Sequence, residues 1–180
     1  MSDFPRLETQ RLVLREIVAA DAAAIFSIHG DANVMRYFGA DPMSEPDQAV
    51  ALIETFTRWR DEENSGIRWG IEHNGQLIGS CGLFRWNHAW HSAMVGYELA
   101  QAAWGQGLMQ EALAAILLYG FHAMNLNRIE AQIHPNNTAS LKLMPKLGFA
   151  HEGHLREVGF WGGQFHDFVQ YGLLKREFAG

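Results

Sequence analysis

The segment around residues 104–108 carries the clearest chemical signal in the sequence. Gly96-Tyr97-Glu98-Leu99 has the pattern of a strand end, and Trp104-Gly105-Gln106-Gly107-Leu108 then leads into a long apolar helix. A strand that stops at closely spaced glycines and opens into a helix leaves several backbone N–H groups pointing at one spot. The glycines let an anion approach without a Cβ in the way, and the helix dipole adds about half a positive charge. This pattern predicts a phosphate or pyrophosphate site.

Other interpretations of these glycines make different demands on the neighbouring residues. A P-loop needs Lys and then Ser or Thr after the last glycine, whereas Leu108 follows Gly107. A dinucleotide-binding fold needs a third glycine where Gln110 stands, inside a βαβ unit, and the preceding segments resemble antiparallel hairpins instead. Neither alternative fits. A plain, tight strand-to-helix turn without any ligand stays open.

Strands and helices alternate along the chain in the order needed to position this loop. A period of two predicts strands at residues 6–17, 67–72, 77–84, 94–99 and 128–133, and two more within 150–174. Helical spacing predicts helices at 22–28, where Asp21 is the expected N-cap, and at 45–60, 108–124 and 137–146. Asn74-Gly75 predicts a primed hairpin turn, and Gly162-Gly163 joins the last two strands. The fold class is therefore α+β, a mixed, mostly antiparallel sheet interrupted by helices.

Composition and charge narrow the class of protein. The 180 residues, 48% of them hydrophobic and 19% charged, fit one folded domain over residues 1–180. A net charge of −6 leaves no basic surface to neutralise a run of phosphates, so no nucleic-acid partner is expected. Neither a signal peptide nor the roughly 20 apolar residues that span a bilayer can be found, and no membrane partner is expected. The single Cys81 suits a reducing compartment, which predicts a cytoplasmic protein.

Taken in order, several segments resemble the GNAT superfamily of N-acetyltransferases, and within it the Rim-type branch, which acts on ribosomal-protein N-termini. Trp104-Gly105-Gln106-Gly107-Leu108-Met109 resembles the acetyl-CoA signature Q/R-x-x-G-x-G/A, with Trp104 and Met109 as departures. The other segments are Thr9-x-Arg11-Leu12-x-Leu14-Arg15, Asn137-x-x-Ser140 with Lys146-Leu147-Gly148-Phe149, and Glu152-Gly153-x-Leu155-Arg156 with Gly162-Gly163 and His166-Asp167. The resemblance covers about residues 7–174.

This resemblance implies a GNAT fold with helices on both faces of the sheet and a splayed strand pair, 94–99 and 128–133, that forms the acetyl-CoA cleft. Acetyl-CoA is then the expected cosubstrate, and the acceptor is a primary amine on a protein N-terminus or a small molecule. The expected state is a monomer or a homodimer. The residues expected to hold acetyl-CoA are Leu99, Trp104, Gly105, Gln106, Gly107, Leu108, Met109, Asn137 and Ser140.

The resemblance also suggests which residues move protons when an amine attacks the thioester. Ser140 is the expected general acid for the departing thiolate, and Glu98 the expected base, with Glu130 and Tyr97 as alternatives. Because neighbours on a strand point to opposite faces, at most one of Tyr97 and Glu98 looks into the cleft. An α-amino group has a pKa of roughly 7.7 to 8.0, against roughly 10.4 for lysine, so an N-terminal acceptor needs less help from a base.

Departures from the family pattern keep two other functions open. Met144 stands where many members carry a tyrosine acid, and Gly159 aligns with a glutamate implicated in catalysis in some Rim-type enzymes. One alternative is an acetyltransferase for a small molecule such as an antibiotic or polyamine. The other is a non-catalytic acyl-CoA-binding regulatory module.

Two further sets of residues invite a ligand interpretation. Lys142 and Lys146 are candidate partners for the adenosine 3′-phosphate of the cosubstrate, although helical lysines are usually solvated. The pairs His88-x-x-His91 and His151-x-x-His154 have a spacing that could suit a metal, but no cysteine or carboxylate completes either set. No metal is expected.

Overall fold

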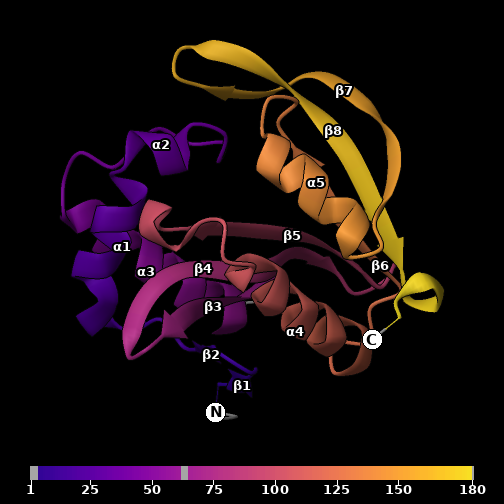
Figure 1. Ribbon diagram of the computed structural model, residues 1–180, viewed down its shortest axis with the longest axis horizontal. Coiled ribbons are helices and arrows are strands. Elements are labelled where there is room, and N and C mark those ends of the chain that lie inside the picture. Colours follow the sequence, from indigo (N-terminus) through magenta and orange to yellow (C-terminus); the bar gives the residue numbers. More distant parts are fainter. Residues whose placement is uncertain (1–3, 62–64, 180) are drawn as a thin grey trace.

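One eight-stranded sheet runs through the protein, in the strand order β1-β2-β3-β4-β5-β6-β8-β7 (Figure 1). The computed structural model describes residues 4–61 and 65–179. Every neighbouring pair of strands is antiparallel except β5 and β6. The strands are β1 Leu7–Glu8, β2 Val13–Arg15, β3 Gly66–His73, β4 Gln76–Asn87, β5 Ser92–Leu99, β6 Arg128–Ile133, β7 Ala150–Trp161 and β8 Gln164–Leu174. The expected α+β class and mostly antiparallel sheet are confirmed.

The N-terminal segment differs from the single strand predicted at residues 6–17. It forms two short strands, β1 and β2, because the chain turns at Thr9. The Thr9 N–H donates to the Leu12 carbonyl at 3.0 Å, and the Thr9 hydroxyl accepts from the Leu12 N–H at 3.0 Å. The sequence pattern hid this turn, because Leu12 and Leu14 follow it with charged residues before and after them, Arg11 and Arg15, as a continuing strand would.

Helices α1 Ala22–His29 and α3 Asp47–Asp61 pack together against one face of the sheet, and the short α2 Ala32–Met35 follows α1 (Figure 1). Ile25, Ile53 and Phe56 form the centre of this cluster. Asp21 precedes α1 as predicted but does not cap it. Its carboxylate instead accepts from the Val18 N–H and pairs with Arg15, so the predicted side-chain cap is wrong.

The main core lies where α4 Leu108–His122 covers the sheet. The apolar residues of α4 include Leu113, Ile116 and Leu117, all fully buried against strand residues such as Leu83 and Trp69. This agrees with a helix that is apolar nearly all round. Among the described residues, no helix is long and apolar enough to cross a membrane.

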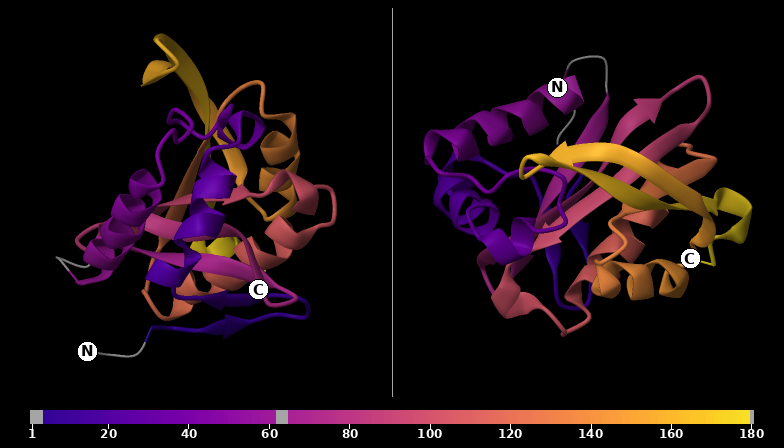
Figure 2. Two further views of the ribbon diagram at one scale, coloured as in Figure 1. Left: turned by 90° about the vertical axis from the view of Figure 1, so that its left-hand side faces the viewer. Right: turned by 90° about the horizontal axis from the view of Figure 1, so that it is seen from above.

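Two glycine-containing turns behave as their sequences predict. Asn74 and Gly75 have φ values of 52° and 76° in the β3–β4 hairpin, as a primed turn requires. Gly162 and Gly163 connect β7 to β8 with φ values of 59° and 73°. This last hairpin stands over α5 Thr138–Lys146 and arches beyond the sheet towards α2 (Figures 1 and 2).

Strands β5 and β6 pair over only three residues. Their parallel register joins Ser92 to Arg128, Ala93 to Ile129 and Met94 to Glu130. Beyond Met94, β5 continues to Leu99 beside β4, while β6 continues beside β8. The expected splayed strand pair is therefore present, and both free backbone edges face the opening between the strands.

Candidate active site

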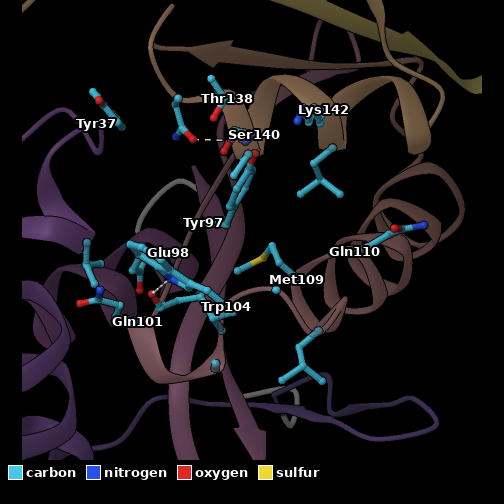
Figure 3. A pocket seen from close by; sticks show the side chains of 18 of the residues that line it. Tyr37, Tyr97, Glu98, Gln101, Trp104, Met109, Gln110, Thr138, Ser140 and Lys142 are labelled. Carbon is cyan, nitrogen blue, oxygen red and sulfur yellow. Dashed lines mark hydrogen bonds between the residues drawn. The ribbon is translucent and has the colours of Figure 1, made fainter.

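A cavity of about 580 Å³ lies at the carboxyl end of β5, where β5 has separated from β6. One wall is α2 with the residues that follow it, another is α5, and the loop from β5 to α4 lies between them. Figure 3 shows Tyr37 and Gln101 at one end of the cavity and Gln110 and Lys142 at the other, with Tyr97 and Ser140 between. The structure brings together every residue expected to hold acetyl-CoA except Gln106.

The glycine loop is shaped to present backbone donors. Gly105 and Gly107 have φ values of 74° and 76°, a region that residues with a Cβ rarely adopt. A Cβ on Gly105 would meet no atom within 4 Å, and one on Gly107 would meet only Arg11 at 3.6 Å, so the backbone and not packing requires glycine. Gly107 is the N-cap of α4, and the first N–H groups of that helix have no acceptor within it. These donors suit an anion.

Two side chains stabilise the loop from within. The Trp104 indole N–H donates to the Leu99 carbonyl at 2.7 Å, which closes the turn after β5. The Gln106 side-chain amide donates to the Ala102 carbonyl at 3.1 Å, and its backbone carbonyl accepts from Arg11 at 3.0 Å. The Gln106 side chain therefore supports the loop, and Gln106 is not among the residues that line the cavity, so its expected contact with acetyl-CoA stays a prediction.

Asn137 and Ser140 come from the start of α5. The Asn137 side-chain oxygen accepts from the Ser140 N–H at 3.2 Å and so caps the helix. The amide NH2 of Asn137 is left for another acceptor, and the residue lines the cavity. Ser140 is 7% exposed, and its hydroxyl lies beside the ring of Tyr97 (Figure 3).

Tyr97 projects from β5 towards Ser140 (Figure 3). Burial raises the pKa of Tyr97 to about 12, against a smaller, opposite effect of the Ser140 side chain. Its buried hydroxyl has no well-aligned hydrogen bond to any described residue. Tyr97 is therefore protonated at neutral pH and is a donor facing the cavity, so it is a poor base.

Glu98 points to the opposite face of the sheet from Tyr97, as strand alternation predicts. Its side chain is 1% exposed and forms an ion pair with Arg68, which also donates to Ser80 at 2.8 Å. Ser80 donates to Glu98, and the His29 Nε2 lies 3.3 Å from the carboxylate. Burial opposes ionisation, but Arg68 and then the His29 and Ser80 contacts outweigh it and hold the pKa of Glu98 below its usual value. A carboxylate so enclosed is a poor base for an incoming amine, which argues against the role expected of Glu98.

Comparison with known proteins agrees with this geometry. The family model described as an acetyltransferase (GNAT) domain matches residues 11–150. The chain belongs to the GNAT acetyltransferases. The match spans the glycine loop, the splayed strands and α5, which are the elements that form the cavity.

Several relatives match this GNAT chain over nearly its full length. The uncharacterized N-acetyltransferase YoaA of Bacillus subtilis (strain 168) is 38% identical over 174 residues, 96% of this chain and 98% of that one. The structure of Mycobacterium smegmatis RimJ in complex with CoA-disulfide is similar with a TM-score of 0.86 and 25% identity, over 94% of this chain and 84% of RimJ. The spermidine N-acetyltransferase of Vibrio cholerae, solved with CoA and spermine, has a TM-score of 0.83 and 25% identity, covering 96% of this chain and 100% of that one. The protein is an N-acetyltransferase, and the Rim-type resemblance is confirmed.

Acetyl-CoA is the cosubstrate of this GNAT acetyltransferase, and the residues present fit it. The glycine loop offers backbone donors where a pyrophosphate needs them. Lys142 and Lys146 are exposed on α5 and line the same end of the cavity. Their ammonium groups could bind the adenosine 3′-phosphate of the cosubstrate there. When bound, acetyl-CoA supplies the thioester whose acyl group is transferred.

Two positions explain how this chain departs from the usual GNAT pattern. Met144 is fully buried in the main core, so no acid can act from that place. A Cβ on Gly159 would lie 2.6 Å from the Trp161 ring and 2.9 Å from Phe168, so aromatic rings fill the space that a glutamate would need. Both family roles are therefore missing at these positions, as the sequence comparison indicated.

Sequence reasoning missed an aromatic cluster that joins α2 to the β7–β8 hairpin. Tyr37 stacks on His134 with ring centres 4.7 Å apart, and His134 contacts both His166 and Trp161. Trp161 also donates to the carbonyl of Arg36 at 3.4 Å. These residues lie far apart in sequence and share no period. Only the pairing of β6 with β8 and the return of β7 bring them together.

Other residues singled out from the sequence lie apart from the cavity. Trp104 lines the cavity, whereas Trp90 is 79% exposed and Trp86 stacks on His88. His154 lies 2.7 Å from Asp167 on the last hairpin, and Glu130 pairs with Arg128. Apart from Trp104, none of these residues lines the cavity.

Proposed function

We propose that this acetyltransferase transfers the acetyl group of acetyl-CoA to a protein or peptide N-terminal α-amine. The observation that supports the proposal is the division of the cavity into two ends with two hydroxyl side chains between them. The glycine loop and the α5 lysines form an anion-binding end, and α2 with its following residues forms an end free for the acceptor. Ser140 and Tyr97 lie between them (Figure 3).

The side chains around the cavity suit an acceptor that loses its proton easily. Glu98 is the one carboxylate among the described residues that line the cavity, and it is paired with Arg68. With no free base, an amine with a pKa of roughly 7.7 to 8.0 reacts far more readily than a lysine amine near 10.4, since much more of it is neutral at pH 7. A water molecule can accept the remaining proton.

We assign to Ser140 the protonation of the departing thiolate. As the amine bonds to the thioester carbonyl and the carbon–sulfur bond breaks, the Ser140 hydroxyl donates its proton to sulfur and recovers one from the Tyr97 hydroxyl through a water molecule, and the proton that the amine loses returns through solvent to Tyr97. Tyr97 is suited to this role because it stays protonated at neutral pH. Positioning of the two substrates in one cavity would supply much of the rate.

A polyamine acceptor is the second candidate, since relatives include a spermidine N-acetyltransferase. A polycation needs carboxylates to bind its ammonium groups, and Glu98 is already neutralised. The charged residues that line the cavity are otherwise basic: Arg36, Lys142 and Lys146. These charges favour the α-amine over a polyamine.

A thiol-release assay tests the proposal. The full chain is incubated with acetyl-CoA and, separately, with N-terminal peptides, the same peptides blocked at the α-amine but carrying a free lysine, and spermidine. We expect release of free CoA thiol with the unblocked peptides at a rate about tenfold or more above the other two groups. Faster release with spermidine would overturn the N-terminal assignment, and acetyl-CoA binding without acceptor-dependent release would favour a non-catalytic module.

A further inference from the structure

Arg36 lies at the acceptor end of the cavity on a segment that is held from both sides. It follows α2, whose N-cap Asp31 accepts from the Asn33 N–H at 2.8 Å through its side chain. Met35, the last residue of α2, is buried. The carbonyl of Arg36 accepts from Trp161 at 3.4 Å, and Asp41, further along, accepts from the Gly162 N–H at 2.7 Å. The backbone that carries the guanidinium is thus fixed between helix and hairpin.

The guanidinium of Arg36 has no carboxylate partner among the described residues. The one hydrogen bond that its guanidinium forms with the residues described is to the Asn33 side-chain oxygen at 3.3 Å. Most other arginines of the described chain are paired, as Arg11 is with Glu111 and Arg15 with Asp21. Four other described arginines also form no ion pair there, but none of them lines the cavity: Arg58, Arg85, Arg156 and Arg176. Arg36 therefore presents free donors where an acceptor must enter.

Polar side chains continue from Arg36 across the mouth of the cavity. Asn33 accepts from Arg36 and lies 3.5 Å from the amide oxygen of Gln101, which follows β5. All three side chains are exposed and line the cavity. A guanidinium flanked by amides is a set of donors suited to a carboxylate, because its planar fork can bond both oxygens at once.

We propose that Arg36 binds a carboxylate carried by the acceptor, so that the preferred acceptor is an α-amine with an acidic group within a few residues. This inference rests on the proposed function and specifies its substrate class. The net charge of −6 opposes an acidic acceptor at long range. At physiological salt that effect is screened beyond about 8 Å, whereas a carboxylate in the cavity contacts Arg36 directly.

A peptide series with one variable tests this assignment. Amidated peptides share the same first residue and differ only at positions two and three, which are both acidic, both alanine or both lysine; free aspartate and glutamate form a separate arm. For the wild-type chain we expect kcat/KM to be about tenfold higher for the acidic peptide than for the alanine peptide, through a lower KM. Higher kcat/KM for the free amino acids would assign the carboxylate to a small acceptor.

Variants at Arg36 separate binding from folding. Arg36→Ala and Arg36→Gln should abolish the preference for the acidic peptide over the alanine peptide, and Arg36→Glu should reverse it towards lysine. Arg58→Ala removes an equally unpaired, exposed arginine outside the cavity and should keep the wild-type preference. Equal kcat/KM for all three peptides in the wild type, or a preference that survives in Arg36→Gln, would overturn the inference alone. Absence of thiol release with every peptide would overturn the proposed function together with it.

Discussion

The Nε2 atom of His134 lies 3.3 Å from the Nδ1 atom of His166. This contact is one of three consecutive hydrogen bonds in which each imidazole ring accepts at Nδ1 and donates at Nε2. The His134 Nδ1 accepts from the Asn136 N–H at 3.1 Å, so its hydrogen is on Nε2. The His166 Nε2 faces the Trp161 carbonyl at 3.1 Å and must donate to it, which leaves Nδ1 as an acceptor. Every position is satisfied only when both rings are neutral. A proton on either ring would turn two donors towards each other.

From these hydrogen bonds we predict that a fall in pH weakens the attachment of the β7–β8 hairpin to α2. Burial and then the neighbouring His166 lower the pKa of His134, while Asp167 opposes them more weakly. Because the unfolded chain takes up this proton more readily, the contribution of His134 to stability is full above pH 6.5 and is lost as pH falls through and below that value. We expect the protection of the hairpin amides against hydrogen exchange, corrected for the intrinsic exchange rate at each pH, to fall between pH 7.5 and 5.5.

Two variants check that His134 is responsible for this pH dependence. His134→Asn cannot be protonated and should remove most of it, at some cost in stability at pH 7.5 because the stacking on Tyr37 is lost. His122→Gln alters an exposed histidine at the end of α4 and should leave it unchanged. A pH profile that is the same in His134→Asn as in the wild type would refute this role.

Ser140 and Tyr97 should act as a unit in proton transfer to the thiolate. Ser140→Ala is expected to lower kcat by about 100-fold, the lower end of general-acid effects, because a thiol with a pKa near 8.5 needs only modest help to leave. Tyr97→Phe should lower kcat less, and the double variant should be no slower than Ser140→Ala. Steady-state kinetics with unchanged affinity for acetyl-CoA would support the assignment. Additive losses in the double variant would mean that the two hydroxyls act independently.

The amide of Asn137 should contribute to acetyl-CoA binding separately from its role as a helix cap. Asn137→Ser keeps an oxygen that can cap α5 but removes the NH2 donor, whereas Asn137→Ala removes both. We expect both variants to raise the KM for acetyl-CoA, and only the alanine variant to lose about 1 kcal/mol of folding stability. A wild-type KM in Asn137→Ser would show that this residue serves the helix alone.

The parts of the site that the sequence predicts are those set by local chemistry. The glycine loop could be found because its backbone conformation at Gly105 and Gly107 is one that glycine adopts without strain. The cap at Asn137 is equally local. Alternation along β5 correctly placed Tyr97 and Glu98 on opposite faces, but both residues line the cavity, which lies where β5 separates from β6, and alternation alone could not show this.

What the sequence could not predict depends on contacts between distant segments. Glu98 is enclosed because β3 supplies Arg68 and α1 supplies His29, and neither segment signals this pairing. Helix α2 has only four residues, too few for a helical period to be visible. The acceptor end of the cavity, including Arg36, therefore emerged only from the fold.

The enclosed Glu98 should contribute to stability and not to catalysis. Glu98→Gln leaves the Arg68 guanidinium buried without its counter-charge, which typically costs 3 to 5 kcal/mol, here about 3 kcal/mol because Ser80 and the Gly96 carbonyl still accept from it. The double variant Arg68→Gln with Glu98→Gln should recover part of that loss.

The contribution of Glu98 to folding stability should also depend on pH. Because the pKa of Glu98 is lowered, this contribution is full above pH 4.5 and is lost as pH falls below that value, and the pH dependence should vanish in Glu98→Gln. Denaturant unfolding measures both the loss of stability and its pH dependence. At a temperature where Glu98→Gln is folded, its kcat should be lower than that of the wild type by less than about tenfold. A loss of 100-fold or more in the folded variant would restore Glu98 as the base, since removal of a general base costs at least about that much.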